Sequence, residues 1–559
     1  MSSEIRVGII QFNPTVGDIA GNADRVTREY RAVAENADIV ATSELSALGY
    51  PPRDLLHRPD LLAAQRRTIE RLARHTENGP PLVLGAATGT DHGTGPPLHN
   101  AAVVLRDGHR HATYAKRLLP TYDVFDEHRY FQPGEEPLVI EVDGIDVGLT
   151  ICEDAWHDTD VTGQRRHGTN PLAETAKAGA DLILTLSASP FSLDKPARRE
   201  RRFTSHAEAT GSPVVFINQV GGNDELIFDG HSLVVHGNRI VERLPGFEPT
   251  TAVVTVGGET VQGTVRRFDR DRETQARAAL GLGVRDYFAK TGFEEAIIGL
   301  SGGIDSSVTA ALATDALGPD SVYGVALPSV VSSEQSVADA RTVAENLGIA
   351  FDVVPIADAV AAIKTDLSAA AQPIDGIAVE NLQARVRGDV LMSLANQRDA
   401  LVLTPDNKSE AAVGYCTLYG DTVGALAPLG DCYKRMVYEL AESFNRRPPV
   451  DGVSQIVPSA VIDKPPSAEL RENQTDADDL PPYDVLDSVL EDYIEDNLTG
   501  AELGEQYDTE VTTEAVARIT ASEFKRRQTP PPLRITRKAL GRGWNYPVAA
   551  EYRHVTESK

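Results

Sequence analysis

Hydrophobic and polar positions alternate with two different periods along residues 1–255. Runs of apolar residues that predict buried strands occur at 5–11, 38–44, 81–88, 100–106, 146–154, 180–189, 213–219 and 231–236. Between several of these runs lie stretches with helical periodicity, such as 22–37 and 171–180. Short apolar runs indicate strands, and a period of 3.6 residues indicates helices. The mixture predicts an α/β sandwich rather than a simple doubly wound sheet.

The pattern changes after residues 256–275, which are polar, contain glycine and lack periodicity. A helical stretch at 275–292 leads to predicted strands at 294–300, 321–328, 350–356 and 399–405, separated by helices such as 333–348. This βαβα order predicts a parallel sheet, in which ligands bind beyond the carboxyl ends of the strands. Residues 457–535, rich in Pro, Asp and Glu, predict an irregular arm followed by short helices. We therefore expect a first domain at 1–258, a linker at 259–275 and a second domain at 276–559.

Composition narrows the class of protein. A chain of 559 residues is too long for one core, so two domains are expected on length alone. The net charge of −28 disfavours nucleic acid or an anionic membrane as a partner, and is also typical of proteins adapted to high salt. We find no signal-peptide pattern at the N-terminus and no apolar run near the ~20 residues that span a bilayer. Three cysteines are too few for a disulfide framework and favour a reducing cytoplasm.

A phosphate-binding turn is predicted at residues 296–308, AIIGLSGGIDSSV. A strand ends in the glycine turn and a helix follows, so backbone N–H groups and the helix N-terminus can surround an anion. Asp305 stands where a carboxylate can hold Mg²⁺ against phosphate oxygens. The turn has no lysine, unlike the GxxxxGK[ST] loop. SGG by itself is equally compatible with an ordinary capped strand–turn–helix.

The longer motif GLSGGIDSS resembles the pyrophosphate-binding loop of the adenylating ATP pyrophosphatases, which include NAD, GMP and asparagine synthetases. Segments 380–396, 403–434 and 523–532 resemble the NAD synthetase domain in particular. The resemblance implies that deamido-NAD contacts Asn381, Glu410 and Lys525 and that Mg²⁺ is held by Asp305 and Glu410. At 405–406, where the family often has Thr-Gly, this chain has Pro-Asp, so no hydroxyl contact to ATP is expected from position 405. The residues implied to bind ATP are Gly299, Leu300, Ser301, Gly302, Gly303, Ile304, Asp305, Ser306 and Thr404.

Three residues of the first domain suit amide hydrolysis. Glu44 lies at a strand end, Lys116 in a polar, turn-rich segment and Cys152 at the end of another strand. A carboxylate can take the thiol proton, the sulfur can attack an amide carbon, and an ammonium can stabilise the oxyanion. Taken singly, each residue is more often a core or surface side chain.

Together and in this order, these residues resemble the Glu–Lys–Cys triad of the nitrilase superfamily, whose fold is an αββα sandwich. The flanking sequences resemble the glutaminase domain of glutamine-dependent NAD synthetases. The resemblance implies that Tyr122, Ser189 and Lys195 bind glutamine and that Glu127 is a second carboxylate near the triad, with Tyr50 and Glu153 as pocket walls.

The two resemblances predict an α/β enzyme with an N-terminal nitrilase-like sandwich and a C-terminal ATP pyrophosphatase domain with a parallel sheet. Ammonia from glutamine would amidate deamido-NAD through an acyl-adenylate, with ATP and Mg²⁺, and family members suggest a homo-oligomer built on synthetase-domain dimers. Three alternatives remain: a GMP synthetase-like amidotransferase, an ammonia-only synthetase with a structural first half, and a dinucleotide-binding protein without activity. The complete triad and the intact loop argue against the last two.

Overall fold

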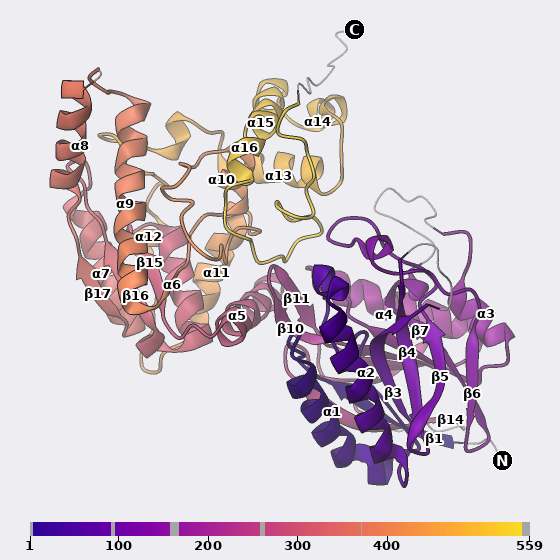
Figure 1. Cartoon of the computed structure of the whole chain (residues 1–559). Coiled ribbons are helices and arrows are strands. Elements are labelled where there is room, and N and C mark those ends of the chain that lie inside the picture. Colours follow the sequence, from indigo (N-terminus) through magenta and orange to yellow (C-terminus); the bar gives the residue numbers. More distant parts are fainter. Residues whose placement is uncertain (1–3, 91–95, 157–166, 258–262, 371, 551–559) are drawn as a thin grey trace. The chain divides into compact units, whose positions relative to one another are not determined.

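The chain folds into two compact units, Met1–Arg270 and Asp271–Lys559 (Figure 1). The computed structural model describes residues 4–90, 96–156, 167–257, 263–370 and 372–550. Part of the expected linker, residues 259–262, lies outside the described residues. Its last residues differ from the expectation, because helix α5 already begins at Arg272 and runs to Thr291. The buried side chain of Gln275 shows that this first turn is packed against the second unit.

The first unit contains two six-stranded mixed sheets. Their inner faces enclose one core, with Val7, Ile39 and Val104 from one sheet and Leu149 and Val215 from the other. The first sheet has the order β14 (Thr250–Gly257), β1 (Glu4–Gln11), β2 (Ile39–Ala41), β3 (Leu82–Gly89), β4 (Leu98–Arg106), β5 (His109–Ala115). The second has the order β13 (Arg239–Arg243), β12 (Leu233–His236), β9 (Val214–Asn218), β8 (Leu182–Ser187), β7 (Ile145–Ile151), β6 (Leu138–Val142).

Helices cover the outer face of each sheet. Helices α1 (Ile19–Val33) and α2 (Pro59–Ala73) pack on the first sheet through residues such as Val26 and Leu72. Helices α3 (Pro171–Lys177) and α4 (Lys195–Thr210) pack on the second through Leu172 and Phe203. The four layers confirm the predicted αββα sandwich.

All eight predicted strands of this unit are present, and they are the interior strands of the two sheets. The strands that the pattern did not predict are the four sheet edges and a separate hairpin, β10 (Val220–Asn223) with β11 (Leu226–Asp229). An edge strand is partly exposed, so it need not be a continuous apolar run. Strand β5, for example, reads HRHATYA and is mostly exposed.

The second unit is built on a four-stranded parallel sheet, as predicted. The strand order is β17 (Ala350–Val353), β16 (Val322–Ala326), β15 (Ala296–Gly299), β18 (Leu401–Val402). Helices α8 (Ala357–Ala370) and α9 (Ile377–Arg398) contribute Val360 and Leu391 to a core with the sheet residues Ile297 and Val325. Helices α6 (Ile304–Leu317) and α7 (Glu334–Leu347) also pack on the sheet, and α11 (Lys434–Arg446) lies against α5 and α6.

The C-terminal part of this unit forms a helical cluster with its own core (Figure 1). Its helices are α10 (Lys408–Val413), α13 (Tyr483–Ile494), α14 (Gly500–Gln506), α15 (Thr509–Ala521) and α16 (Glu523–Arg526), and the four-residue α12 (Ser459–Ile462) comes before α13 in the chain. As predicted for residues 457–535, a largely irregular arm comes first and short helices, α13 to α16, follow it from Tyr483. Leu486 and Leu490, four residues apart on α13, and Ile519 on α15 contribute to the core of this cluster.

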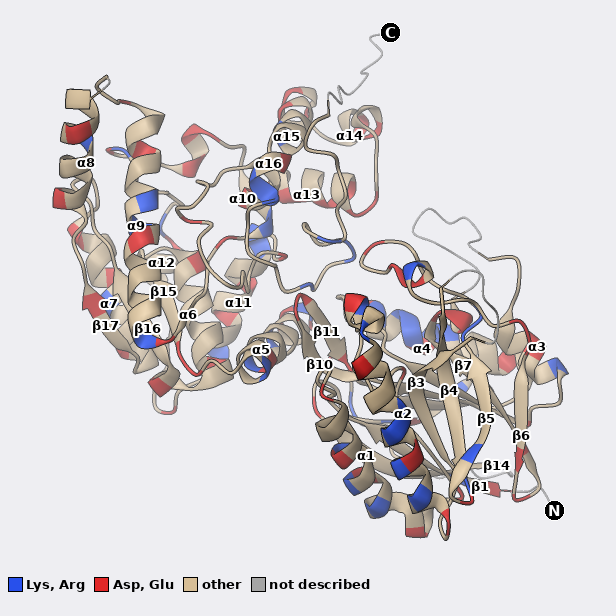
Figure 2. Cartoon of the chain, viewed as in Figure 1, with Lys and Arg blue, Asp and Glu red and all other residues tan. Residues whose placement is uncertain are grey.

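Acidic side chains occur on helices and loops of both units, with basic positions interleaved on α1, α2 and α4 (Figure 2). The acidic excess is thus not confined to one element. Among the described residues, no helix combines the length and the apolar character that crossing a membrane requires.

Candidate active sites

The thiol of Cys152 is held at a sharp turn between a strand and a short helix. Strand β7 ends at Ile151, and Cys152 opens a 3₁₀ turn, Cys152–Ala155, with a positive φ of 42°. Such a conformation is costly for a non-glycine residue and occurs preferentially at functional sites. The buried carboxylate of Asp154 fixes the turn, because it accepts hydrogen bonds from the backbone N–H of Ile151 and of Leu118, both 2.9 Å. The same carboxylate therefore ties the Cys152 turn to the segment after Lys116.

Lys116 lies between two carboxylates, one of them in the predicted triad. Its Nζ donates to Glu44 Oε1 at 2.7 Å and to Glu127 Oε1 at 2.8 Å. Asn100 on β4 also donates to Glu44 Oε1, and the backbone N–H of Ala188 donates to Glu44 Oε2, both at 2.8 Å. All these side chains are almost completely buried. The backbone around Glu44 packs directly against Gly85. A side chain at position 85 would not fit, since its Cβ would collide with the backbone of residues 43–45.

Electrostatics keeps this cluster in a defined resting state. Burial and the carboxylate of Glu44 raise the pKa of the Cys152 thiol well above its usual value, although Lys116 opposes them. Burial favours loss of the proton from Lys116, but Glu127 and Glu44 outweigh it, so the pKa of Lys116 is raised and the ammonium is kept. Burial raises the pKa of Glu127 to about 7 against the opposing effect of Lys116. At rest, the site holds a protonated thiol beside a fixed cation and a possible base.

The structure places the residues predicted to bind glutamine around the same turn. Tyr122 donates its hydroxyl proton to Glu153, the residue after Cys152, at 2.8 Å. Ser189 follows Ala188, whose N–H binds Glu44. Lys195 opens α4, donates to the carbonyl of Pro190 at 2.7 Å and lies 6.0 Å from the ring centre of Trp156, at the end of the Cys152 turn.

Two further residues that were predicted as pocket walls, Tyr50 and Glu153, bind side chains next to the predicted triad. Tyr50 donates to Glu127 Oε1 at 2.8 Å, so it holds the second carboxylate against Lys116. Glu153 is buried and accepts the bond from Tyr122. Asn100 was not predicted; an isolated Asn in a strand has no distinguishing pattern in the sequence, and only strand pairing brings it to Glu44.

The second unit contains a cavity of about 250 Å³ at the carboxyl ends of its parallel strands. All residues predicted to bind ATP line it except Gly302, and Glu410 lines it as well. Its wall also includes Arg387 on α9, Lys434 at the start of α11, and residues 464–470. The location agrees with the rule that parallel sheets bind ligands beyond the ends of their strands.

The glycine turn enters this cavity in the conformation that the motif predicted. Gly302 has φ +78°, and a Cβ there would lie 2.2 Å from the carbonyl oxygen of Ser336, so another residue would not fit. The hydroxyl of Ser301 accepts from the N–H of Gly303 at 3.2 Å and lies 3.1 Å from the hydroxyl of Ser306. The first N–H groups of α6, which have no partners within the helix, are thus presented at the cavity wall.

The ammonium of Lys434 joins the two carboxylates that were predicted to hold Mg²⁺. Its Nζ lies 2.6 Å from Asp305 Oδ2 and 2.8 Å from Glu410 Oε1, and it is almost completely buried. Asn407 donates to Asp305 Oδ1 at 2.9 Å and, through its own Oδ1, caps α10 by accepting from the N–H of Glu410 at 3.0 Å. Two carboxylates thus face one cationic position.

Buried acids around this position repel one another. Burial raises the pKa of Glu410 to about 7, against the attraction of Lys434. Burial, with Asp421, Glu410 and Asp305, raises the pKa of Asp406 well above its usual range. Asp406 Oδ2 is buried and has no hydrogen-bond partner among the described residues. Asp305 and Glu410 are two carboxylates that share the single ammonium of Lys434, which suits a bound cation.

Asn381 and Lys525, both in the described part of the chain, do not line the cavity. Each contacts the loop after α10 instead. Lys525 donates to the carbonyls of Gly414 and Cys416, both at 2.7 Å, and Asn381 Oδ1 accepts from the hydroxyl of Thr417 at 2.8 Å. Tyr415 in the same loop lines the cavity.

Lys434 and Asn407 are the principal site residues that the sequence did not single out. Both lie in the quoted segment 403–434, in the contexts DNK and CYK. A lysine after an apolar–polar turn is usually exposed, so no local signal marked Lys434 as buried. Its role depends on the packing of α11 against α6 and α10.

Comparisons with known proteins cover both units. A Carbon-nitrogen hydrolase family model matches residues 6–266, and an NAD synthase model matches residues 277–529. The "Glutamine-dependent NAD(+) synthetase" of Synechocystis sp. is 40% identical over 556 residues, which cover 98% of this chain and 99% of that protein. The protein of the same name from Aquifex aeolicus is 39% identical, with 98% and 100% covered.

A solved structure of glutamine-dependent NAD+ synthetase from Acinetobacter baumannii, in complex with ADP, is 34% identical to this chain. It aligns with a TM-score of 0.77, and 98% of each chain is covered. The structure from Cytophaga hutchinsonii has a TM-score of 0.81 at 20% identity, which supports the fold.

Proposed function

The chain belongs to the glutamine-dependent NAD(+) synthetases, and from this premise we propose a division of labour between its two units. The first unit hydrolyses glutamine, and the second uses the ammonia and ATP to convert deamido-NAD into NAD, AMP and pyrophosphate. One observation carries the proposal: a buried Glu–Lys–Cys cluster and a cavity with an SGGIDSS turn occur in a single chain. The ADP held by the Acinetobacter baumannii relative supports nucleotide binding.

In the first unit, the Cys152 thiol transfers its proton to Glu44 as the sulfur attacks the amide carbon of glutamine. Lys116 stabilises the negative oxygen of the tetrahedral intermediate, because Glu44 and Glu127 keep it protonated and fixed. Glu44 returns the proton to the departing ammonia and leaves a thioester on Cys152. Glu44 then activates a water molecule, which releases glutamate. Tyr122, Ser189 and Lys195 hold the substrate beside the turn.

In the second unit, the glycine turn binds the phosphates of ATP, and Thr404 lies at the end of β18 as part of the nucleotide wall. The carboxylate of deamido-NAD attacks the α-phosphorus, pyrophosphate leaves, and ammonia then displaces AMP. Asn381 and Lys525 contact the 414–417 loop, and there they support binding of deamido-NAD.

The residues around Lys434 fit a magnesium ion. Asp305 and Glu410 offer carboxylate oxygens at one position, and oxygen donors of this kind are the ligands that Mg²⁺ prefers. No group of three or more His, Cys, Asp and Glu side chains within the described residues would enclose a metal alone. Asp305 and Glu410 would hold the ion together with phosphate oxygens. Bound there, Mg²⁺ would offset the charge of the pyrophosphate that leaves.

The experiment compares wild type with Cys152→Ala, using ATP, Mg²⁺ and deamido-NAD and either glutamine or ammonium as the nitrogen donor. We expect the variant to lose glutamine-dependent NAD formation by at least about 1,000-fold and to retain the ammonium-dependent rate. Cys432→Ala, a buried thiol of the other unit, is the matched control and keeps both rates. A variant that still uses glutamine would exclude the first unit as the ammonia source.

The same assay separates the alternative substrates. XMP in place of deamido-NAD tests the GMP synthetase-like reaction, for which we expect no amidated product. If deamido-NAD gives no NAD with either donor, even at high salt, the assignment of the acceptor is wrong.

We also propose a homo-oligomer that works in the cytoplasm. Helices α8 and α9 each carry two exposed apolar side chains: Ile363 and Leu367 on α8, and Ile377 and Met392 on α9. Such a surface favours self-association. All three cysteines are free, as expected in a reducing compartment. Light scattering of wild type and of Ile377→Glu tests the assembly, which the variant should weaken.

A further inference from the structure

Four consecutive residues at the start of α10, 407–410, divide between two sides: the first and last contact the active site, and the middle two contact the surrounding scaffold. Asn407 and Glu410, three positions apart and so on one side of the turn, bind Asp305 and Lys434. Lys408 and Ser409 point the other way, and Lys408 has no exposed surface. With six residues, α10 is too short to be stable by itself. Its position must therefore be determined by contacts on the scaffold side.

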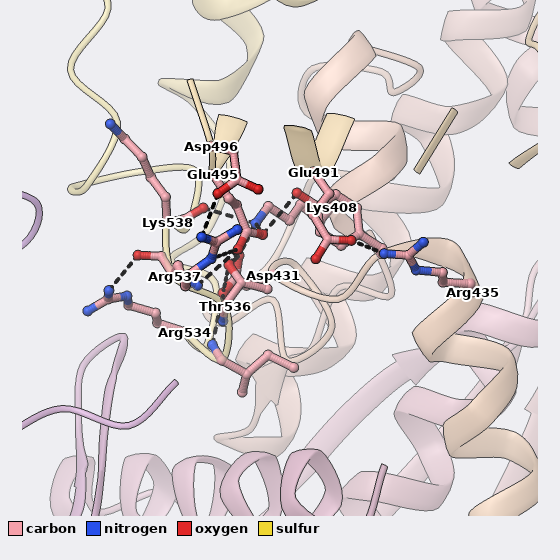
Figure 3. A network of polar contacts seen from close by, with 12 residues as sticks. Lys408, Asp431, Arg435, Glu491, Glu495, Asp496, Arg534, Thr536, Arg537 and Lys538 are labelled. Carbon is pink, nitrogen blue, oxygen red and sulfur yellow. Dashed lines mark hydrogen bonds and ion pairs between the residues drawn. The ribbon is translucent and has the colours of Figure 1, made fainter. Parts of the chain in front are cut away.

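The C-terminal strap, residues 531–538, supplies these contacts (Figure 3). Lys408 Nζ donates to Thr536 Oγ1 at 2.7 Å and to the carbonyl of Lys538 at 2.9 Å, and it also contacts Glu495 Oε1 at 2.9 Å and Asp431 Oδ1 at 3.0 Å. The three protons of the ammonium are thus all used within the network. Lys408 is one of several partners of Asp431, and the other hydrogen-bond donors to this carboxylate come from the strap.

Asp431 is completely buried and accepts from the backbone N–H groups of Ile535 and Thr536, at 2.8 and 2.7 Å. The hydroxyl of Thr536 lies 2.8 Å from Asp431 Oδ1. Arg537, also on the strap, donates its N–H to Glu495 Oε2 at 3.2 Å. Without the strap, the buried carboxylates of Asp431 and Glu495 would share the single positive charge of Lys408 and lose their other donors from the strap. Burial of such incompletely compensated charge would lower the free energy of unfolding.

The strap lies beyond residue 529, where the match to the NAD synthase model ends, yet it is built into the core. Leu533 and Ile535 have no exposed surface, and the backbone of Ala427 pairs with Pro531 and Leu533 on either side. A segment that only trailed from the unit would not be buried in this way.

We propose that Lys408 and Thr536 are positioning residues, through which the C-terminal strap holds α10 so that Asn407 and Glu410 keep their places beside Asp305. This inference rests on the proposed synthetase function, because the residues that the strap is proposed to position are those that would bind the metal–nucleotide complex. The hydroxyl of Thr536 bridges the two buried charges, because it accepts a hydrogen bond from Lys408 and donates one to Asp431.

The test uses the full chain with Thr536→Val, which keeps the side-chain shape and removes the hydroxyl. Binding of Mn²⁺, in place of Mg²⁺, is measured by electron paramagnetic resonance with α,β-methylene ATP, which cannot be cleaved at the reacting bond. We expect Mn²⁺ to bind about ten-fold more weakly, as for loss of a buried hydrogen bond to a charged group. Thr536→Ser should restore the affinity to within about two-fold, and glutamine hydrolysis should not change in either variant.

A destabilised control separates positioning from general loosening. Leu347→Ala creates a cavity at the end of α7, away from the strap, and should lower the melting temperature without weakening Mn²⁺ binding. Unchanged Mn²⁺ affinity in Thr536→Val, or equal weakening in Leu347→Ala, would overturn the positioning role. Absence of Mn²⁺ binding in wild type would overturn the metal assignment together with the positioning role, and the glutaminase rate would show that the protein is intact.

Discussion

The ammonium of Lys434 lies 2.6 Å from Oδ2 of Asp305, the acidic residue of the SGGIDSS turn. The same ammonium contacts Glu410, so it stands where the proposed metal ligands converge. Both carboxylates raise the pKa of Lys434 against the effect of burial, so it remains charged. Lys434 is therefore the resident counter-ion of this site, and a metal ion that enters must share or replace it.

Replacing this counter-ion should make stability depend on magnesium. Lys434→Met leaves Asp305 and Glu410 without their cation, and breaking such a buried pair costs about 3–5 kcal/mol. Added MgCl₂ supplies the missing charge, so calorimetry should show a larger rise in melting temperature in the variant than in wild type. Lys464→Met, which removes a half-buried lysine from the same cavity, is the control. Equal rises in Lys434→Met and wild type would contradict the counter-ion role.

Asp406 should tolerate loss of its charge. Because burial and the neighbouring acids raise its pKa, the side chain is largely protonated and resembles asparagine in shape and charge. We expect Asp406→Asn to change the free energy of unfolding by less than about 1 kcal/mol and nucleotide affinity by less than about three-fold. Asp305→Asn, measured by the same titration calorimetry, should weaken Mg²⁺-nucleotide binding clearly. A large loss in Asp406→Asn would show that this position needs a carboxylate.

Glu127 should make the first unit less stable as the pH rises. Its pKa is about 7 in the folded protein and 4.5 for an unperturbed group, so its contribution is fully present below pH 4.5 and is lost as the pH approaches 7. The stability of wild type relative to Glu127→Gln should therefore fall across this window, by up to about 3 kcal/mol.

The two tryptophans allow this measurement on one unit. Trp156 lies in the first unit and Trp544 in the second, so a Trp544→Phe background leaves fluorescence that reports the first unit alone. Urea unfolding at several pH values then gives the two stability curves. If the stability of wild type and of Glu127→Gln changes with pH in the same way, Glu127 does not titrate in this range.

High salt should stabilise the protein. A net charge of −28 gives strong self-repulsion, which screening by salt reduces. Raising KCl from about 0.1 M to about 2 M should raise the melting temperature by several degrees. A parallel series in sucrose is the control. Sucrose is also excluded from the protein surface but carries no charge, so it stabilises without screening the self-repulsion. Full activity and unchanged stability in dilute buffer would count against adaptation to salt.

Much of the architecture and the family could be predicted from local patterns. The interior strands of the first unit appear as apolar runs because they are buried on both faces, and its four edge strands were missed because they are partly exposed. In the second unit all four strands of the sheet were predicted, including the edge strands β17 and β18. The GLSGGIDSS turn was recognisable as a short local motif, and its Gly302 has a structural reason, because a Cβ there would collide with the backbone of Ser336. The resemblance to glutamine-dependent NAD synthetases is confirmed by the comparisons. The site residues inferred from it stay predictions that the variants above test.

The sequence by itself determined the two α/β units, the acidic character and the chemistry available in each: a thiol with an acid and an amine, and a glycine turn with an aspartate. These depend on residue types and short-range spacing. Only the tertiary structure decided which charges share a site. Lys116 joins Glu44 to Glu127, Lys434 joins Asp305 to Glu410, and Lys408 meets Asp431 and Thr536, because strand pairing and helix packing bring together residues that are far apart in the chain. A buried ion pair leaves no local trace in the sequence, since the same lysine would be exposed in another fold.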